Sequence, residues 1–327
     1  MMVQIPPELH GQKILITGGA GAIGSRMVKA LTPVADILVV DDFSSGYRIA
    51  IDPSVRLIQG SINESRVLHE AFKFNPRYVV HLAANFANQN SVDNPEKDLM
   101  VNGMGTLRVL QEAARVGAEG FVYSSSSCIY GGHSGELRES MATMHLDTPY
   151  AVSKLLGEYY SNYFAEATSM RTCSVRYFNS FGPSEFPGPY RNVIPNFIFK
   201  ALKGESLEVM GDGSSTRDFT YIDDSVTGTL LALTRGVTGE VYNVGTGVET
   251  KVIYLAERVN ELTGNSSEIK YRPQRSWDRI AHRKASLEKS KELLGYSPQV
   301  SFDEGLVATV DWLRENFDML LGAVGSR

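Results

Sequence analysis

Tyr150 and Lys154 stand four residues apart in the segment PYAVSKLLGEYYSNYF, whose spacing predicts a helix. Residues i and i+4 share one face of a helix, so the phenol and the amine can meet there. A tyrosine with its ordinary pKa near 10 is a poor base at neutral pH, but a nearby ammonium group favours the phenolate. Such a pair could take a proton from a hydroxyl group while a hydride leaves the same carbon. Ser126, at the end of a predicted strand, could hydrogen-bond the same oxygen as it becomes a carbonyl.

A tyrosine and a lysine at this spacing occur often, usually as a packed ring beside a solvated amine. A glycine-rich loop makes the pair more specific. Gly18, Gly21 and Gly24 lie between a predicted strand at 13–17 and a predicted helix at 22–31. Glycine there lets the backbone approach a pyrophosphate, which the positive end of the helix then attracts. The pattern therefore predicts a dinucleotide site beside the Tyr–Lys pair.

An acidic residue follows the second predicted strand, as such a site requires. Asp41, with Asp42 beside it, could accept hydrogen bonds from the ribose hydroxyls of an adenosine and repel a 2′-phosphate. This favours NAD over NADP. The alternative is that either carboxylate only caps a strand or turn. A bound nicotinamide would add its own positive charge next to Tyr150.

The elements that must position these residues alternate regularly in the first half of the chain. Short apolar runs at 13–17, 36–42, 55–60, 77–84, 120–127 and 172–179 predict strands, with helices between several of them. This alternation predicts an α/β fold, a doubly wound parallel (Rossmann) sheet. The stretch 95–116 has helical spacing. After about residue 180 the elements become shorter and less regular, EVYNVG among them, and the Pro- and Gly-rich stretch FGPSEFPGPYRN predicts a loop over the site. We expect a dinucleotide-binding domain at 1–180 and a smaller lobe at 181–327, interleaved with the sheet.

Composition narrows the class of protein. The formal net charge is −5, which gives no support to binding of nucleic acid or a membrane surface. Two cysteines, Cys128 and Cys173, and six scattered histidines predict neither a disulfide framework nor a metal site. The first residues lack a secretion signal, and no apolar run is long enough to span a membrane. We expect a cytoplasmic globular protein.

The motifs together resemble those of a known family. The chain resembles the extended short-chain dehydrogenases/reductases that modify nucleotide sugars, and it looks most like the UDP-glucose 4-epimerases. The resemblance covers nearly the whole chain. It is carried by TGGAGAIG (17–24), VDDFSSG (40–46), HLAA (81–84), SSSSCIYG (124–131), PYAVSK (149–154), RYFNSFGP (176–183) and RDFTYIDD (217–224).

Position by position, the resemblance implies a catalytic set, a cofactor site for NAD and a substrate site. The catalytic residues it implies are Ser126, Tyr150 and Lys154. The cofactor residues are Gly18, Gly21, Ala22, Ile23, Asp41, Asp42, Ser61, Ile62, Leu82, Ala83, Ala84, Asn102, Tyr150 and Lys154. The substrate residues are Asn85, Ser126, Tyr150, Asn179, Asn192, Val193, Met210, Arg217 and Arg275. Planar bidentate arginines suit a diphosphate, although Arg217 could instead pair with Asp218.

The sequence also departs from the family. The 4,6-dehydratases carry Asp–Glu after the catalytic hydroxyl, where this chain has Ser127 and Cys128, and the UDP-glucuronate decarboxylases usually carry Glu at the position of Cys128. Ser61 replaces an Asp that commonly contacts the adenine. The segment NFANQNS (85–91) is unusual for a galactose epimerase, and it should lie beside the sugar.

The resulting expectation is an NAD-dependent epimerase that acts at C4 of a UDP- or TDP-linked sugar and forms a homodimer. One alternative is oxidation followed by decarboxylation, in which Arg191 or Arg283 could bind the substrate carboxylate. Others are net reduction of a keto-sugar and a catalytically silent NAD-sensing or scaffold protein. Silent relatives usually lose the tyrosine or the lysine, and this chain has both.

Overall fold

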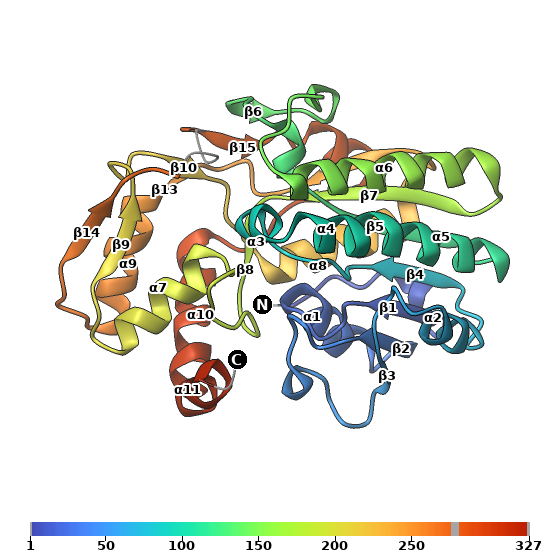
Figure 1. Cartoon of the computed structure of the whole chain (residues 1–327), viewed down its shortest axis with the longest axis horizontal. Helices are drawn as coiled ribbons and strands as arrows, with labels where there is room; N and C mark the ends of the chain where they lie inside the picture. Colours follow the sequence, from blue (N-terminus) through green and yellow to red (C-terminus); the bar gives the residue numbers. More distant parts are fainter. Residues whose placement is uncertain (1, 276–280, 326–327) are drawn as a thin grey trace.

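A parallel sheet of seven strands forms the centre of the molecule in the computed structural model, which describes residues 2–275 and 281–325 (Figure 1). Its order is β12-β7-β5-β4-β1-β2-β3. The strands are β1 (Lys13–Thr17), β2 (Asp36–Asp41), β3 (Arg56–Gln59), β4 (Tyr78–His81), β5 (Gly120–Ser126), β7 (Arg171–Tyr177) and β12 (Val241–Val244). The strand order reverses between β1 and β4, the position at which ligands bind in such folds. The predicted doubly wound sheet is confirmed.

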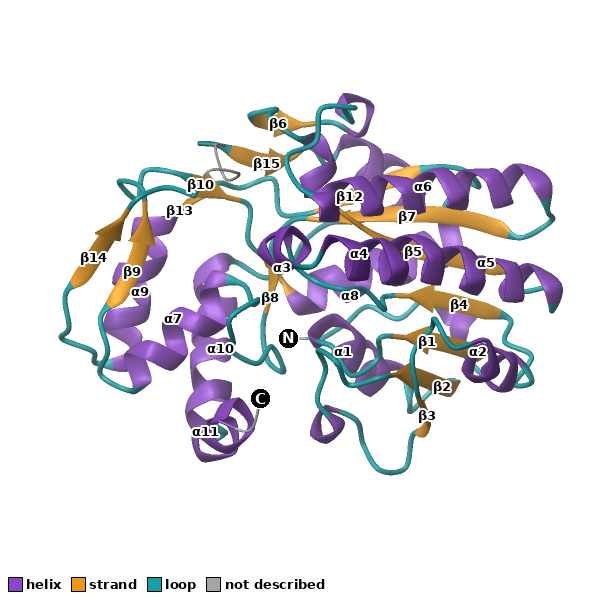
Figure 2. Cartoon of the chain, in the orientation of Figure 1, coloured by secondary structure: helices purple, strands orange, loops and turns teal. Residues whose placement is uncertain are grey.

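Helices cover both faces of this sheet (Figure 2). Ile14 and Ile16 of β1 pack into one core with α1 (Ala22–Leu31) and α8 (Ile222–Arg235). Leu15, between them, packs into a second core on the other face. That core includes α2 (Ser65–Phe72), α5 (Thr106–Arg115) and α6 (Pro149–Ala167). Because alternate side chains of a strand point to opposite faces, a strand buried on both reads as a continuous apolar run.

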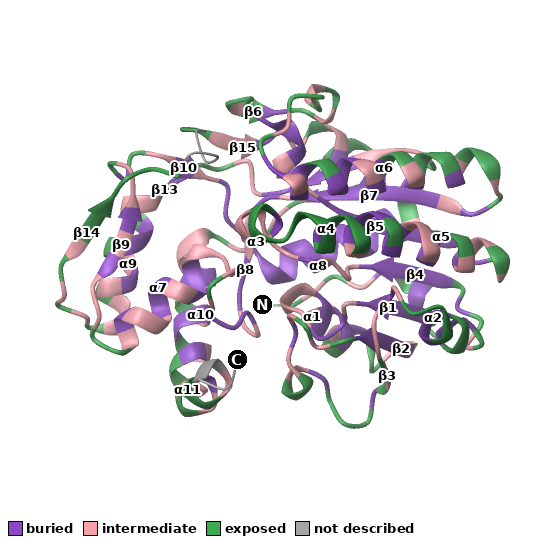
Figure 3. Ribbon diagram, viewed as in Figure 1, coloured by how far each residue is buried: buried purple, intermediate pink, exposed green. Residues whose placement is uncertain are grey.

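The remaining elements form a smaller lobe with its own apolar core and a set of connecting pieces (Figure 3). Its helices are α7 (Val193–Leu202), α9 (Val252–Thr263), α10 (Phe302–Glu315) and α11 (Phe317–Gly325). Short strands pair as β9 (Leu207–Met210) with β14 (Ile269–Arg272), β10 (Thr216–Arg217) with β13 (Thr250–Lys251), β8 (Ser180–Phe181) with β11 (Thr220–Tyr221), and β6 (Gly135–Leu137) with β15 (Arg283–Ala285). Short helical pieces are α3 (Asn88–Asp93), α4 (Pro95–Asp98), η1 (Pro7–Leu9), η2 (Arg48–Ala50), η3 (Leu99–Gly105), η4 (Ser127–Tyr130), η5 (Glu139–Met141) and η6 (Ser290–Leu294).

The structure differs from the sequence-based predictions in three features. The segment EVYNVG was grouped with the later, less regular elements, but it forms β12 and extends the main sheet beside β7. The helices α8 and α9 were not predicted. The predicted helix at 95–116 is α4, then a π-helical stretch at Leu99–Gly105, then α5. None of the helices within residues 2–275 and 281–325 combines the length and apolar character that a membrane span needs.

Candidate active site

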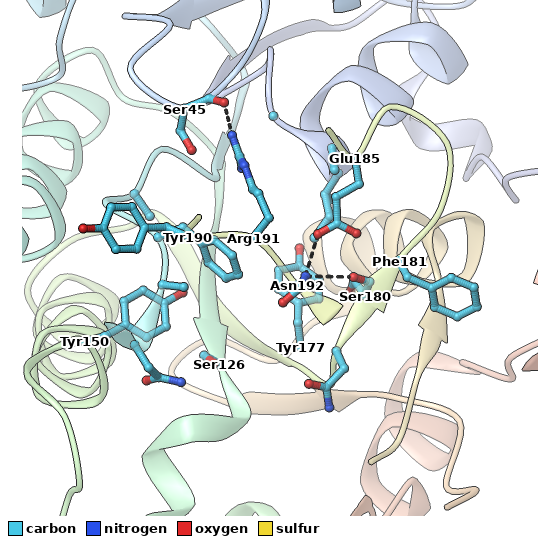
Figure 4. Close-up of a pocket in the computed structure, with 18 of the residues that line it drawn as sticks. Ser45, Ser126, Tyr150, Tyr177, Ser180, Phe181, Glu185, Tyr190, Arg191 and Asn192 are labelled. Carbon is cyan, nitrogen blue, oxygen red and sulfur yellow. Dashed lines mark hydrogen bonds between the residues drawn. The ribbon is translucent and has the colours of Figure 1, made fainter. Parts of the chain in front are cut away.

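A cavity of about 810 Å³ lies where the carboxyl ends of the central strands meet the smaller lobe. It is lined from one side by residues that follow β1, β2, β4 and β5, and from the other by the loop 180–192, α7 and β9. Figure 4 shows Ser126 and Tyr150 near one side of the cavity and Glu185 across it, with Asn192 between them. Both the predicted cofactor residues and the predicted substrate residues therefore border one continuous space.

The glycine loop is shaped for a close backbone approach. Gly18 has φ +72°, and a Cβ there would lie 2.5 Å from the backbone nitrogen of Ala83. A Cβ on Gly24 would lie 2.3 Å from the carbonyl oxygen of Gly18. Gly21 is the N-cap of α1 and brings no side chain to cover the first amide groups of the helix. These features fit the pyrophosphate of a dinucleotide, which the helix terminus attracts.

Asp41 ends β2 and organises the loop around the glycines. Its carboxylate is buried and accepts hydrogen bonds from the backbone nitrogens of Ala20 and Phe43, both at 2.8 Å. Asp42 is exposed and accepts one from the backbone nitrogen of Ser44 at 2.8 Å. Both aspartates also line the cavity, so each holds a turn at its edge.

The Tyr–Lys pair stands in the first two turns of α6. Thr148 caps this helix by accepting a hydrogen bond from the backbone nitrogen of Ala151, and Pro149 takes the first helical position. The nitrogen Nζ of Lys154 lies 5.6 Å from the ring centroid of Tyr150 and donates to the carbonyl oxygen of Ser124 at 2.8 Å. Ser126 ends β5, beside them, and its Oγ accepts a hydrogen bond from the backbone nitrogen of Cys128.

Burial dominates the electrostatics of this set. It raises the pKa of Tyr150 well above its ordinary value and lowers the pKa of Lys154 to about 8. It also raises the pKa of the Cys128 thiol to about 11, so this cysteine is a neutral group beside the pair. The ammonium group alone therefore does not make Tyr150 a phenolate, and formation of the base depends on additional positive charge.

Nearly all residues predicted for ligand binding line the same cavity. They are Gly18, Gly21, Ala22, Ile23, Asp41, Asp42, Ser61, Ile62, Leu82, Ala83, Ala84, Ser126, Tyr150, Lys154, Asn179, Asn192, Val193, Met210, Arg217 and Arg275. On the smaller-lobe side, Asn179 Nδ2 donates to the carbonyl oxygen of Asp218 at 3.2 Å. Asn192 immediately precedes the first turn of α7. Its Nδ2 donates to Glu185 Oε1 at 2.7 Å.

Two predicted residues lie behind the cavity wall. Asn85 and Asn102 are buried and bond to each other, the backbone nitrogen of Asn85 donating to Asn102 Oδ1 at 2.8 Å. Asn102 Nδ2 also donates to Asp98 Oδ1 at 2.8 Å. The Asn102 side chain therefore supports the wall, because both backbone groups of Asn85 bond to its amide. The Asn85 side chain accepts a hydrogen bond from Asn90 Nδ2 at 3.1 Å.

The alternative of an ion pair between Arg217 and Asp218 is not found within the described residues. The Asp218 carboxylate instead accepts hydrogen bonds from the backbone nitrogens of Thr246, Gly247 and Ala285. Arg217 Nη1 donates to the carbonyl oxygen of Thr216. Asp218 thus holds together the backbone segments at 246–247 and 285. Arg217 lines the cavity.

Sequence reasoning missed Glu185 within the loop predicted to reach over the site. Its side chain is buried, borders the cavity, and burial raises its pKa to about 7. The composition of FGPSEFPGPYRN indicates a loop, but which of its side chains turns inward depends on tertiary packing, such as the stacking of Phe186 on Tyr47 with ring centroids 3.8 Å apart. The only signal in the sequence was that Glu185 is the single acidic residue of this loop.

Comparison with known proteins agrees with this geometry. The model of the "NAD dependent epimerase/dehydratase family" matches residues 14–245. The structure of an epimerase from Methanothermobacter thermautotrophicus is similar at 46% identity with a TM-score of 0.95, covering 97% of this chain and 96% of that one. A Thermotoga maritima UDP-glucose 4-epimerase, solved with UDP-glucose, has 34% identity and a TM-score of 0.89, covering 93% and 99%.

A relative with a different activity is also similar. The UDP-N-acetyl-α-D-glucosaminuronate decarboxylase of Bacillus cytotoxicus is 33% identical over 318 residues, which cover 93% of this chain and 98% of the relative. The family match covers most of the chain and includes the glycine loop and the Tyr–Lys pair. The chain belongs to the NAD-dependent epimerase/dehydratase family.

Proposed function

We propose that this NAD-dependent enzyme is a nucleotide-sugar 4-epimerase. Tyr150 takes the proton of the C4 hydroxyl, and Ser126 hydrogen-bonds the same oxygen as it becomes a carbonyl. Bound NAD supplies the hydride chemistry. The 4-keto sugar turns about its diphosphate linkage and presents its other face, and Tyr150 returns the proton to the oxygen. Lys154 stabilises the phenolate from behind.

The observation that carries this proposal is the absence of a carboxylic acid directly after Ser126. Elimination of the C6 hydroxyl needs an acid and a base there, but the chain has Ser127 and Cys128, and the thiol is neutral with its pKa raised to about 11 by burial. Among the described residues, the carboxylates that line the cavity are Asp41, Asp42, Glu185 and Glu208, on other elements. Chemistry at C4 alone requires none of them.

The remaining cavity residues fit the proposed ligands. Gly18, Gly21, Ala22 and Ile23 would border the NAD pyrophosphate, and Asp41 its ribose, with Leu82, Ala83 and Ala84 beside the nicotinamide half. Asn179, Arg217 and Arg275 would bind the sugar diphosphate, for which planar donors are suited. Asn192, Val193 and Met210 would follow the nucleotide. In this proposal residues 1–180 chiefly bind NAD and residues 181–327 chiefly bind the nucleotide sugar, although β12 and α8 belong to the main sheet.

A second candidate is oxidation followed by decarboxylation of a nucleotide-linked uronate. Arg283 lines the cavity beside the turn that follows Ser126, and its guanidinium donates to the carbonyl oxygens of Ser127 and Gly131 at 3.2 and 2.7 Å. A cation there could bind a substrate carboxylate, and the B. cytotoxicus relative is named for a uronate. Cys128, in place of an acid, disfavours the decarboxylation step itself.

We propose a homodimer built on the outer faces of α6 and the π-helical stretch. These neighbouring helices expose large apolar side chains, which a monomer rarely leaves uncovered. The exposed residues are Leu99, Met100, Met104, Val152, Tyr159 and Tyr163.

Incubation of the purified protein with a panel of donors tests the proposed function. UDP-glucose, UDP-galactose, UDP-glucuronate, UDP-N-acetylglucosamine and TDP-glucose are supplied without added NAD, and products are followed by NMR. A C4 epimer from any donor, absent with Tyr150→Phe, supports the proposal and identifies the sugar. Carbon dioxide and a pentose from UDP-glucuronate would establish the second candidate instead. No turnover with any donor would contradict this choice of substrates.

A further inference from the structure

Asp98 is a buried carboxylate close to the Tyr–Lys pair but outside the cavity. It ends α4, is 1% exposed, and is followed directly by the π-helical stretch Leu99–Gly105. Single π-helical turns inside helices often accompany functional sites. Here the stretch contains Asn102, whose Nδ2 donates to Asp98 Oδ1 at 2.8 Å.

A short polar chain leads from Asp98 to the first turn of α6. Asn102 Nδ2 lies 3.2 Å from Ser153 Oγ, and Ser153 Oγ donates to the carbonyl oxygen of Tyr150 at 3.1 Å. Ser153 is buried and immediately precedes Lys154. The carboxylate, the amide and the hydroxyl thus lie behind the catalytic face of α6.

Lys154 is 2% exposed, so its ammonium form depends on the groups around it. The groups whose charges act on it are Asp98 from α4, Glu158 from α6 and the Cys128 thiol from η4. His81 of β4 also interacts with it, and the rings of Tyr123 and Tyr150 lie 5.1 and 5.6 Å from Nζ.

The negative charge of Glu158 is compensated by a cation of its own, and the cysteine, the tyrosine and the histidine are neutral. Glu158 forms a bidentate, buried ion pair with Arg176, at 2.9 and 2.8 Å. Burial raises the pKa of Cys128 to about 11 and that of Tyr123 well above its ordinary value, so both are neutral. Burial lowers the pKa of His81 to about 3, so its ring is neutral and bonded to Thr17 and Thr106.

Among the described groups that act on Lys154, Asp98 is therefore the carboxylate that forms no ion pair with an arginine. Burial raises the pKa of Asp98, while the Ser153 hydroxyl, the charge of Lys154 and Asn102 lower it. Carboxylate and ammonium each make the charged form of the other more favourable. The arrangement matters most when the positive nicotinamide ring arrives, since that ring disfavours a second cation.

We propose that Asp98 is a positioning residue that, together with Asn102 and Ser153, keeps Lys154 protonated behind Tyr150. It does not line the cavity and acts through the lysine. The inference rests on the proposed function only in giving Lys154 a catalytic use.

A titration of Lys154 tests the inference without any sugar. The protein is purified with its bound NAD and with ¹³C-labelled lysine side chains, and the Cε resonance of Lys154 is assigned by its loss in Lys154→Met. In Asp98→Asn the pKa of Lys154 should fall by about one unit, the lower end of the effect of a neighbouring carboxylate. Glu96→Gln, an equivalent change at an exposed position on the same helix, should leave it unchanged. An unchanged Lys154 titration in Asp98→Asn overturns the inference.

Ser153→Ala decides the matter if Asp98→Asn does not fold. Loss of the hydroxyl makes the charged form of Asp98 less favourable, so the pKa of Lys154 should again fall, by less. If it does not, the inference is wrong. Once a donor is identified, Asp98→Asn should lower kcat about fivefold near pH 8 with little change in KM, because a fall of one unit from a pKa of about 8 reduces the charged fraction of Lys154 from about one half to about one eleventh. Asp98→Glu, which keeps the carboxylate, should retain most of the parent kcat. A change in KM alone would contradict the proposed role.

Discussion

At the scale of single residues, the site combines a phenol, Tyr150, that keeps its proton with an ammonium group, Lys154, that loses its proton easily. Burial raises the pKa of Tyr150 and lowers that of Lys154 to about 8. Both shifts oppose formation of the phenolate–ammonium pair in the structure without ligands. The positive charge of NAD would favour the phenolate, and the Asp98 carboxylate would preserve the ammonium. The base thus forms only when the cofactor site is filled.

The activity should accordingly fall as the pH rises through the pKa of Lys154. The charged lysine is present below about pH 8 and is lost above it, so the alkaline limb of the kcat profile should lie near pH 8. In Lys154→Arg the guanidinium stays charged to above pH 12, so any residual activity should lack that limb. The measurement is kcat against pH for both proteins. An identical limb in Lys154→Arg would show that another group titrates.

That Ser126, Tyr150 and Lys154, the proposed catalytic residues, border one cavity was predictable from the sequence, because each belongs to a local motif. The support behind these residues was not. Asn85 and Asn102 were expected at the ligand, yet they bond to each other, and Asn102 also donates to Asp98. That network depends on a π-helical stretch, which has no distinct signal in the sequence.

At the scale of elements, one buried ion pair fixes the helix that carries Tyr150 and Lys154. Arg176 on β7 and Glu158 on α6 have side chains 4% and 6% exposed. Arg176 also donates to the hydroxyl of Tyr130 and the carbonyl oxygen of Glu139. Removing one partner would leave a buried charge unpaired, which is far more costly than losing an exposed pair.

Glu158→Ala should therefore lower the free energy of unfolding by about 3 kcal/mol, as for other broken buried pairs. Glu112→Ala removes the partner of the half-exposed Arg115 on α5 and should cost clearly less, because an exposed ion pair contributes little to stability. Urea unfolding of both variants checks the difference. Equal losses would mean that the buried pair does not anchor α6.

The glycine loop gives a second prediction at this scale. Gly18→Ala adds a Cβ 2.5 Å from the backbone nitrogen of Ala83 and strains a residue at φ +72°. Gly117→Ala adds the same strain at φ +70° with nothing within 4 Å. We expect a loss of about 1 kcal/mol for Gly117→Ala, and a clearly larger loss together with depleted bound NAD for Gly18→Ala. Equal stability and equal NAD content in the two variants would contradict the close approach of the loops that follow β1 and β4.

At the scale of the whole molecule, the first half was predictable and the second less so. Strands β1, β2 and β4 of the main sheet are nearly continuous apolar runs, which follow from burial on both faces. By contrast α8, α9 and the placement of β12 depend on contacts between distant segments. The Asn243 side chain of β12 illustrates this. It accepts a hydrogen bond from the hydroxyl of Tyr130 and donates one to the carbonyl oxygen of Leu137, both more than 100 positions away.

The exposed apolar face of α6 provides a prediction about assembly. Val152 on this face is 53% exposed, and Val237, after α8, is 50% exposed. Val152→Glu would bring a charge into the proposed dimer interface and should shift the protein from dimer to monomer in light scattering. Val237→Glu should leave the mass unchanged. A monomeric parent protein, or a dimer that tolerates Val152→Glu, would contradict the proposed interface.

The central claim, reversible chemistry confined to C4, is tested most directly by running the reaction in D₂O without added NAD. An epimerase returns the same hydride to C4, so the product should be the C4 epimer with no deuterium on any ring carbon, and Tyr150→Phe should form none. A decarboxylase or a dehydratase must reprotonate C5 from solvent. Deuterium at C5, with loss of carbon dioxide or of water, would contradict the account.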